Sequence, residues 1–172
     1  KRLLLIVLPL LLIVGCSKVE GKQDLIPVVE TYDNGNIKNI AYHKKSRTGI
    51  EKIKYEEYYK NGQKESEETY KDGKPDGKWT YWYENGQKWQ EGTYKDDKED
   101  GLFTEWYENG QKIREVTFKD GKKDGLLTYW YENGEKKSEV TFKDGIRDGK
   151  VTAWYENGQK QSEGTYKDWE LI

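Results

Sequence analysis

The chain has 172 residues, of which 36% are charged and only 33% hydrophobic, and its formal net charge is −2. Such polarity is typical of disordered chains, but 14% of the residues are aromatic and recur at regular positions, which predicts a folded protein with a thin, aromatic core. Positive and negative charges alternate, so the basic stripe that nucleic-acid binding requires is absent from the sequence. One Cys and one His exclude an internal disulfide and argue against a Cys/His metal cluster, and we expect neither a metal nor a cofactor.

The first residues have the layout of a secretory signal. Lys1 and Arg2 precede an apolar run of 12 residues, Leu3–Val14, and Gly15 and Cys16 follow it. A membrane-spanning helix needs roughly 20 apolar residues, so this run is too short to be one. We therefore expect a helical signal peptide over residues 1–15 and a polar tether over residues 16–26.

Ile13-Val14-Gly15-Cys16 resembles the lipobox of bacterial lipoproteins. The resemblance implies cleavage before Cys16, a diacylglyceryl thioether on its sulfur and acylation of its amine. Several acyl chains on one residue give stable anchoring to a membrane, because each buried CH2 group contributes about 0.8 kcal/mol. We accordingly expect an exported, membrane-anchored lipoprotein of the cell envelope, at the outer membrane or cell surface rather than in the cytoplasm. The alternative is a plain signal peptide with a chance Cys.

An internal repeat dominates the rest of the chain. Asn-Gly occurs at 34–35 and then at 61–62, 85–86, 109–110, 133–134 and 157–158, the last five spaced by 24 residues. Between them lie loops of the form Lys-Asp-Gly-x-x-Asp-Gly at residues 71–77, 119–125 and 143–149, and residues 95–101 form the same loop with Asp97 in place of its first Gly. Fixed spacing of this kind indicates an array of stacked structural units.

Asn-Gly between two alternating aromatic runs predicts a β-hairpin with a two-residue type I′ turn, in which both central residues have positive φ. With Asn85-Gly86 as that turn, the predicted cross-strand pairs are Tyr83–Lys88, Tyr81–Gln90, Trp79–Gly92, Gly77–Tyr94 and Trp82–Trp89. One hairpin is marginal by itself, so several must stack. The predicted fold class is therefore all-β: an elongated, open, single-layer sheet of tandem antiparallel hairpins.

Alternation divides each hairpin between two faces. The aromatic–glycine face is predicted to carry Trp79, Tyr83, Tyr94 and their counterparts, and the Trp-Thr-Glu face Thr80, Trp82, Trp89, Glu91 and theirs. The columns predicted as a candidate binding surface are Trp82, Trp106, Trp130 and Trp154, and Tyr83, Tyr107, Tyr131 and Tyr155. In the structural interpretation these aromatics form the core, whereas in the functional one a thin sheet leaves an aromatic stripe exposed to a partner.

The repeat is less regular at both ends. Residues 53–168 are interpreted as the tandem array, and residues 27–52 as a degenerate N-terminal hairpin that caps it. In this hairpin the pattern loses register near His43, and Ser46–Lys52 is interpreted as an irregular insertion. Residues 169–172 form a C-terminal tail, which we expect to fold back over the open edge of the sheet because an exposed edge strand needs cover.

With these columns in view, the array resembles the variant of the MORN repeat (membrane occupation and recognition nexus) that is found in many bacterial proteins. The matching stretches are Tyr83–Lys88 and Glu91–Asp96 with their copies, over roughly residues 27–168. The resemblance implies binding or scaffolding and, for some bacterial members, an antitoxin role. The best-known MORN repeats place Gly at the positions that are Trp79, Phe103, Leu127 and Val151 here, which implies a more filled groove.

The glutamates recur in equivalent positions along the array and offer no unique pair for acid–base chemistry, so we expect no enzyme. The function predicted is that of a non-catalytic, envelope-anchored scaffold, attached to the membrane through a lipid on Cys16 and presenting its repeated surface to a protein partner. One alternative is an antitoxin or immunity protein that caps a toxin. Another is an adhesin that binds cell-wall material or a glycan.

Overall fold

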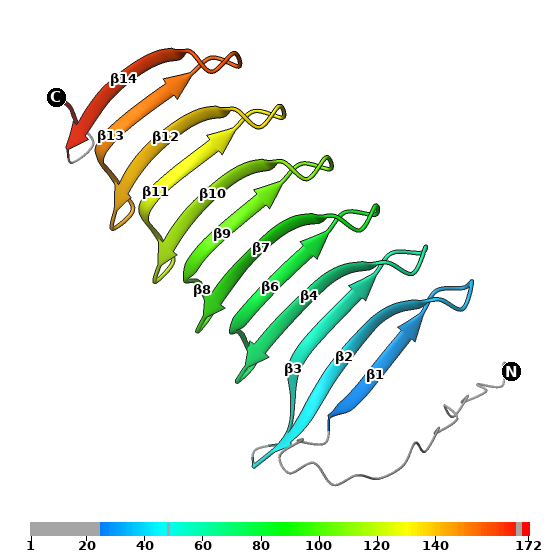
Figure 1. The fold of residues 1–172 in the computed structure, drawn as a ribbon. Coiled ribbons are helices and arrows are strands. Elements are labelled where there is room, and N and C mark those ends of the chain that lie inside the picture. Colours follow the sequence, from blue (N-terminus) through cyan, green and yellow to red (C-terminus); the bar gives the residue numbers. More distant parts are fainter. Residues whose placement is uncertain (1–24, 48, 168–169) are drawn as a thin grey trace, which may run out of the picture.

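The computed structural model describes residues 25–47, 49–167 and 170–172. These residues form one antiparallel sheet in which hairpin follows hairpin in chain order (Figure 1). The strands are β1 (Ile26–Thr31), β2 (Ile37–Ser46), β3 (Gly49–Tyr58), β4 (Lys64–Lys71), β5 (Lys74–Pro75), β6 (Gly77–Trp82), β7 (Lys88–Lys95), β8 (Lys98–Glu99), β9 (Gly101–Trp106), β10 (Lys112–Lys119), β11 (Lys122–Trp130), β12 (Lys136–Lys143), β13 (Ile146–Trp154), β14 (Lys160–Lys167) and β15 (Glu170–Leu171). The predicted open all-β sheet is thus confirmed, whereas the predicted signal helix lies outside the described residues.

The Asn-Gly loops line one margin of the sheet, but they are not the two-residue turns that the sequence predicted. After β6, the Tyr83 N–H donates to the Gln87 carbonyl (2.8 Å) and the Gly86 N–H donates to the Tyr83 carbonyl (2.9 Å). Gly86 has positive φ (83°) and Asn85 does not, so the loop contains three residues and ends on a left-handed glycine. The Asn85 side chain accepts a hydrogen bond from the Gln87 N–H (2.9 Å), which closes the loop.

The extra loop residue changes the register beside the loop. The predicted pairs Gly77–Tyr94, Trp79–Gly92 and Tyr81–Gln90 are confirmed. The register then shifts between Tyr81 and Trp82, and Trp82 pairs with Lys88. The predicted Trp82–Trp89 and Tyr83–Lys88 pairs are therefore wrong, because a three-residue loop leaves one strand a residue longer than its partner. The Trp89 ring instead packs edge-on against Tyr81, with 5.6 Å between ring centroids.

The two-residue turn with positive φ at both central residues occurs instead at the opposite margin of the sheet, in the Asp-Gly turns. Asp72 and Gly73 have φ of 50° and 75°, and Lys71 pairs with Lys74 across them. Aspartate tolerates this left-handed conformation better than most residues, because its short side chain can bond to the nearby backbone. Asp97 occupies the second position with φ of 70°, where the sibling turns have glycine.

Both margins tie each hairpin to the next. At the loop margin, the Tyr83 hydroxyl donates to the Trp106 carbonyl (2.7 Å), and Asn85 Nδ2 donates to the Glu108 carbonyl (3.2 Å). At the turn margin, the Asp97 N–H donates to the Pro75 carbonyl (2.9 Å). The loop bonds recur from Tyr32, Tyr59, Tyr107 and Tyr131 and from Asn61, Asn109 and Asn133. The spacing of the repeats is thus held at both ends of every hairpin as well as by the strand ladders.

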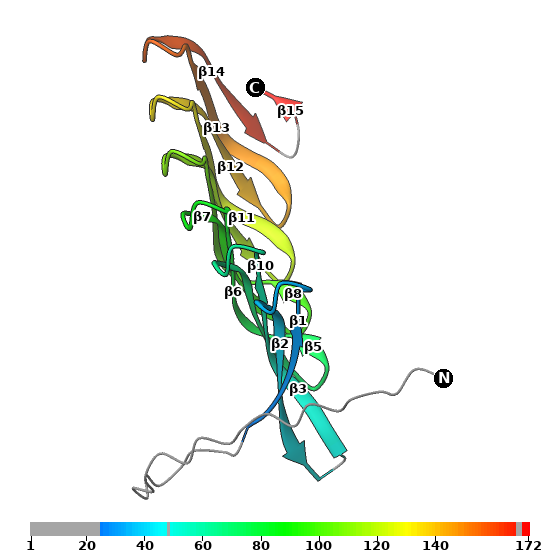
Figure 2. The ribbon, with the colours of Figure 1, turned by 90° about the vertical axis from the view of Figure 1, so that its right-hand side faces the viewer.

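The apolar core lies on the aromatic–glycine face. Its buried members are Phe103, Val116, Leu127 and Phe142. Rings from neighbouring columns contact one another in a zigzag: Tyr70–Trp79, Trp79–Tyr94, Tyr94–Phe103 and Phe103–Phe118, with centroids 4.7–5.6 Å apart. The Asp-Gly ends of the hairpins bend out of the plane of the sheet (Figure 2). Since the described residues contain no second layer, the single sheet buries its core by packing each repeat against the next.

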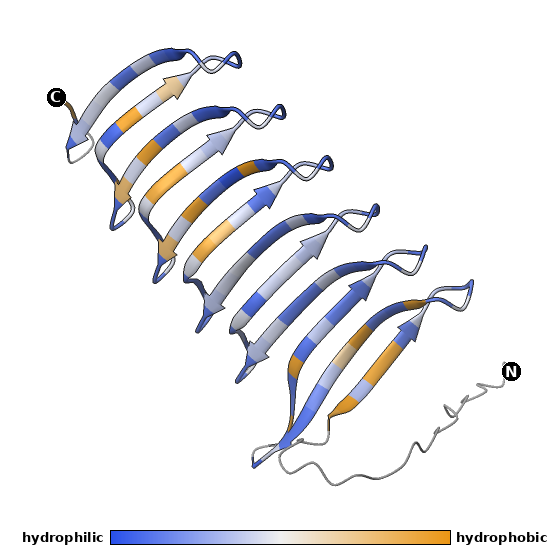
Figure 3. Ribbon diagram, in the orientation of Figure 1, coloured by the Kyte–Doolittle hydropathy of each residue, from blue (hydrophilic) through white to orange (hydrophobic). Residues whose placement is uncertain are grey.

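The N-terminal hairpin is more regular than the sequence suggested. The expected loss of register near His43 is confirmed as a shift between Tyr42 and His43. Most of the predicted insertion, however, lies in strands, because β2 and β3 stay paired out to Ser46–Gly49. The insertion thus lengthens a hairpin rather than interrupting it. Hydrophobic residues are concentrated in β1, β2 and β9–β13, whereas β4, β6 and β7 are mostly hydrophilic (Figure 3).

The described part of the C-terminal tail folds back as predicted. Leu171 pairs with Tyr166 and Glu170 pairs with Lys167, and the Ile172 N–H donates to the Thr165 carbonyl (3.0 Å). This contact covers one end of β14.

Replacing Asp97 with glycine is expected to raise the free energy of unfolding by about 0.5–1 kcal/mol. The left-handed conformation costs a side-chain-bearing residue about 1–2 kcal/mol, and the greater freedom of glycine in the unfolded chain offsets part of the gain. Urea unfolding of D97G measures the change. The matched control is G121D, which places aspartate at the equivalent position of the next turn and should lower the free energy of unfolding by a similar amount. A less stable D97G would show that the turn is not strained.

Replacing Gly92 with valine should destabilise the protein by about 1–3 kcal/mol through overpacking. A Cβ atom at Gly92 would lie 2.3 Å from the Phe103 ring, although later repeats carry Val116 and Val140 in this column. Adding Phe103→Leu should restore most of the stability, because the resulting Val-Leu-Val set reproduces Val116, Leu127 and Val140. Thermal melts of wild type, G92V and G92V/F103L test this, and a double variant no more stable than G92V would contradict it.

Candidate binding surface

The predicted tryptophan column lies on the Trp-Thr-Glu face at the loop ends of β6, β9, β11 and β13, where every indole is partly buried. A lysine of the preceding repeat lies over each ring: Lys64 over Trp82, Lys88 over Trp106, Lys112 over Trp130 and Lys136 over Trp154, at 5.3–6.0 Å from the ring centroid. Such contacts contribute about 0.5–1 kcal/mol each at exposed sites. The column is therefore a row of lysine-covered rings rather than a bare aromatic groove.

The predicted tyrosine column has a clear structural role in the array. Tyr83, Tyr107 and Tyr131 extend to the following hairpin, where their hydroxyl groups meet the tryptophan carbonyls. Tyr155 belongs to the last repeat, has no such acceptor among the described residues and is 50% exposed. The structure thus brings the two predicted columns together at the loop margin, and their role in binding stays a prediction.

Threonine and glutamate alternate along the middle of the same face. Thr80, Thr104, Thr128 and Thr152 are 4–6% exposed. Thr104, for example, pairs with Glu91 on one side and Glu115 on the other. The glutamates bond to lysines, as in the contacts of Glu91 with Lys78 (3.0 Å) and Lys88 (2.5 Å). The face is consequently a lattice of ion pairs above a row of buried threonines.

These ion pairs keep the carboxylates charged. Burial by itself raises the pKa of Glu91, but hydrogen bonds from Lys88 and Lys78 outweigh it and hold the pKa below its usual range. The same two contacts from Lys160 and Lys150 lower the pKa of Glu163. General acid–base chemistry needs two carboxyls whose pKa values are shifted apart, whereas the pKa values of Glu91 and Glu163 are shifted in the same direction.

Glu56 differs from these glutamates because it is buried, and the sequence did not predict this. It lies on β3 in the row that later repeats fill with threonine, and only 5% of it is exposed. Its carboxylate accepts hydrogen bonds from Lys64 Nζ (2.7 Å), Tyr42 (2.9 Å) and Tyr58 (2.9 Å), and Lys54 Nζ lies 3.0 Å away. With the buried charge bonded on all sides, the cluster stabilises the N-terminal repeats. The only signal in the sequence was a glutamate at a threonine position.

The pKa values of the cluster reflect this network. Burial raises the pKa of Glu56, but the bonds from two lysines and two tyrosines outweigh it and hold the pKa far below its usual range. Burial and the bond to Glu56 raise the pKa of Tyr58 to about 12. The carboxylate is therefore fixed in its charged form and is unsuited to proton transfer.

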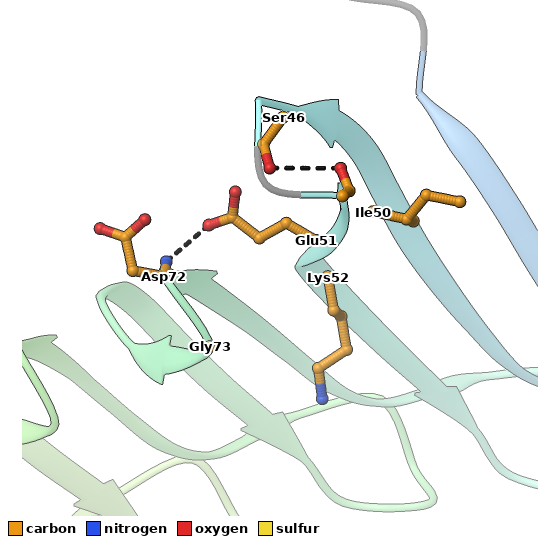
Figure 4. A pocket seen from close by; sticks show the side chains of 7 residues that line it. Ser46, Ile50, Glu51, Lys52, Asp72 and Gly73 are labelled. Carbon is orange, nitrogen blue, oxygen red and sulfur yellow. Dashed lines mark hydrogen bonds between the residues drawn. The ribbon is translucent and has the colours of Figure 1, made fainter.

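Several shallow depressions mark the surface of the described residues, and two of them bear on the candidate site. The first, of about 430 Å³, lies between the β2–β3 hairpin and the following Asp-Gly turn, as Figure 4 shows. Within it the Glu51 carboxylate accepts a hydrogen bond from the Asp72 N–H (2.6 Å). At the next turn, the Asp76 carboxylate accepts the equivalent bond from the Asp96 N–H (3.3 Å). Glu51 therefore takes the place of Asp76 at the turn of the N-terminal unit. The polar groups of the first depression thus have a structural role.

The second depression is a groove of about 310 Å³ on the Trp-Thr-Glu face. It is lined by Leu126, Glu139, Thr141, Lys150, Thr152, Trp154, Lys160 and Glu163. Aliphatic, aromatic, cationic and anionic side chains thus meet in one open groove, which fits a peptide better than a compact metabolite.

Some predictions concern features that the described part of the chain does not contain. Cys16 and the apolar run before it lie outside the described residues. Within those residues, none of the elements is a helix of the length and apolarity needed to cross a bilayer. No group of three or more His, Cys, Asp or Glu side chains in the described part is placed to hold a metal ion.

Replacing Glu56 with glutamine should lower the free energy of unfolding by about 3 kcal/mol at pH 7, because two lysines lose their shared buried partner. A carboxylate whose folded pKa is depressed contributes stability above its unfolded pKa of about 4.3 and loses it as the pH falls. The difference in free energy of unfolding between wild type and E56Q should therefore decrease as the pH falls from about 5 to about 2. Urea unfolding across this range measures it, with E84Q on an exposed loop as the control. A gap that does not change with pH would contradict the assignment.

Comparison with known proteins agrees with the repeat geometry. The family model described as MORN repeat variant matches residues 48–72, 75–96, 99–120, 123–144 and 147–168, which together make up more than half of the chain. A search of curated proteins gives no match. The five matched segments each span one Asn-Gly loop with its flanking strands, and they confirm the predicted resemblance from residue 48 onward. The chain belongs to the MORN repeat variant family.

Proposed function

We propose that this protein is a non-catalytic scaffold of the bacterial cell envelope, anchored through a lipid on Cys16, whose Trp-Thr-Glu face binds another protein. The anchor rests on the lipobox-like residues Ile13–Cys16. The scaffold role rests on the array, in which each repeat presents the same face at the same spacing. Repeat arrays of this kind offer extended surfaces rather than single deep sites.

The observation that carries the proposal is the row of carboxylate–lysine ion pairs that recurs from repeat to repeat. Glu91 and Glu163 lie three repeats apart, and each is bonded to two lysines in the same geometry. Glycoside hydrolysis and related chemistry need one carboxyl held in its acid form, whereas each of these carboxylates is paired with at least one lysine. A row of repeated ion pairs supports recognition, because complementary charges on a partner would fix its position along the face.

The lysines also favour a protein over a glycan. Sugar rings bind aromatic side chains through an open ring face, and here a lysine lies over each of the four tryptophans. A protein segment can match the alternating charges and replace those contacts with its own. We therefore place a protein first among the possible partners.

Replacing Cys16 with serine should abolish labelling of the protein by a clickable fatty acid and release most of it from sedimented membranes, because the thioether can no longer form. Ser17→Ala is the control and should leave both labelling and sedimentation unchanged. Persistent labelling of C16S would refute the anchor. Crosslinking of the wild-type protein in native membranes should yield a specific protein adduct. Retention on purified peptidoglycan without any adduct would instead favour the glycan-binding alternative.

A further inference from the structure

One column of the Trp-Thr-Glu face breaks the repeat. Two residues before each buried threonine, and therefore on the same face, the last four hairpins carry Lys78, Leu102, Leu126 and Lys150, so that the central two of these four have leucine. The two leucines are 52% and 47% exposed, and neither belongs to the core, which lies on the other face. Lysine occupies the same column in the flanking repeats, so the fold itself does not require leucine there.

The substitution changes the neighbouring carboxylates. In the flanking repeats, Glu91 is bonded by Lys78 and Lys88, and Glu163 by Lys150 and Lys160. In the central repeats, the described residues supply one lysine each: Lys112 to Glu115 and Lys136 to Glu139. Two exposed leucines therefore lie beside two carboxylates that have room for a second cation.

We propose that Leu102, Leu126, Glu115 and Glu139, here called the leucine stripe, bind a segment of a partner protein that carries apolar side chains next to Lys or Arg. This inference rests on the proposed function and specifies the chemical character of the segment that the partner protein presents. The carboxylates select a cationic segment and repel an anionic membrane surface. The groove that runs from Leu126 to Trp154 receives one apolar side chain, with Glu139 in its wall.

The geometry also limits the shape of the segment. Leu102 lies on β9 and Leu126 on β11, with β10 between them. Two strand spacings of about 4.8 Å separate the leucines by roughly 9.6 Å across the sheet. A polyproline II segment rises about 9.3 Å in one turn of three residues, so side chains three apart point to the same side at the same spacing. An extended segment with an apolar residue at every third position therefore matches the stripe.

The test uses synthetic peptides on the purified chain. The probe contains four copies of Leu-Lys-Pro, and the controls contain four copies of Leu-Glu-Pro or of Ser-Lys-Pro. Binding is followed by tryptophan fluorescence, since Trp106 and Trp130 lie on the same face. We expect the Leu-Lys-Pro peptide to bind at least about tenfold more tightly than either control, because only it supplies both the apolar and the cationic contacts. Equal binding of the Leu-Glu-Pro peptide would overturn the proposal.

The variant L102K/L126K converts the central repeats to the flanking type and gives each carboxylate a second lysine. Its thermal stability should therefore match the wild type, whereas its affinity for the Leu-Lys-Pro peptide should fall at least about tenfold. The reverse variant K78L/K150L extends the stripe and should bind the peptide more tightly. Unchanged peptide binding by L102K/L126K would refute the stripe.

Crosslinking in membranes separates this inference from the proposed function. If wild type and L102K/L126K capture the same envelope protein equally well, the scaffold role stands and the stripe is refuted. Loss of that adduct in L102K/L126K, with Ser162→Ala on the other face as an unaffected control, supports both. If neither chain forms an adduct while the peptide still binds the stripe as expected, the proposed function fails and the stripe's chemistry stands.

Discussion

The hydrogen bond from each loop tyrosine to the next repeat connects the array, as in the bond from Tyr83 to the Trp106 carbonyl. A single-layer sheet cannot rely on a second layer to hold its strands in place, and one hairpin alone is marginally stable. Tyrosine extends across the gap between hairpins with an apolar ring, and its hydroxyl satisfies a carbonyl at the end of a strand. The asparagine of the loop adds a second bond, from Asn85 to Glu108. These contacts set the spacing that every column on the sheet repeats.

With the spacing fixed, the two faces of the sheet can specialise. The aromatic–glycine face buries a narrow core because residues of neighbouring repeats are matched in volume, as Gly92 is to Phe103 and Val116 is to Leu127. The Trp-Thr-Glu face buries threonines beneath ion pairs whose lysines also lie over tryptophan rings. Exposed ion pairs each contribute little, but a lattice of them holds the surface in one arrangement. Departures from that arrangement, at the leucines and at Glu56, are consequently easy to recognise.

Much of the fold was predictable because the period and the residue types point the same way. The 24-residue spacing, the alternation of Trp79 with Thr80 and the paired strands around Asn85-Gly86 define the hairpin and most of its register. The two-residue turn with positive φ at both positions was predicted at Asn-Gly, whereas the structure has it at Asp-Gly. Both Asn-Gly and Asp-Gly suit a two-residue mirror-image turn, and the choice depends on contacts with the neighbouring repeat, such as the bond from Asn85 to Glu108 and that from Asp97 to Pro75. A sequence pattern read one hairpin at a time does not contain those contacts.

The candidate surface was likewise predictable in part from the sequence. By itself the sequence determined which side chains share a face along most of each strand, because alternation along a strand is a local property, but the bulge at Trp89 brings that ring against Tyr81 rather than Trp82. It thereby placed the tryptophan and tyrosine columns and the glutamate row. Tertiary structure alone decided how exposed those side chains are, since Lys88 reaches Trp106 only across the repeat boundary and Glu56 becomes buried only when Tyr42, Lys54 and Lys64 surround it. Exposure depends on what the next repeat places beside a residue, and the packing of one repeat on another exists only in the folded array.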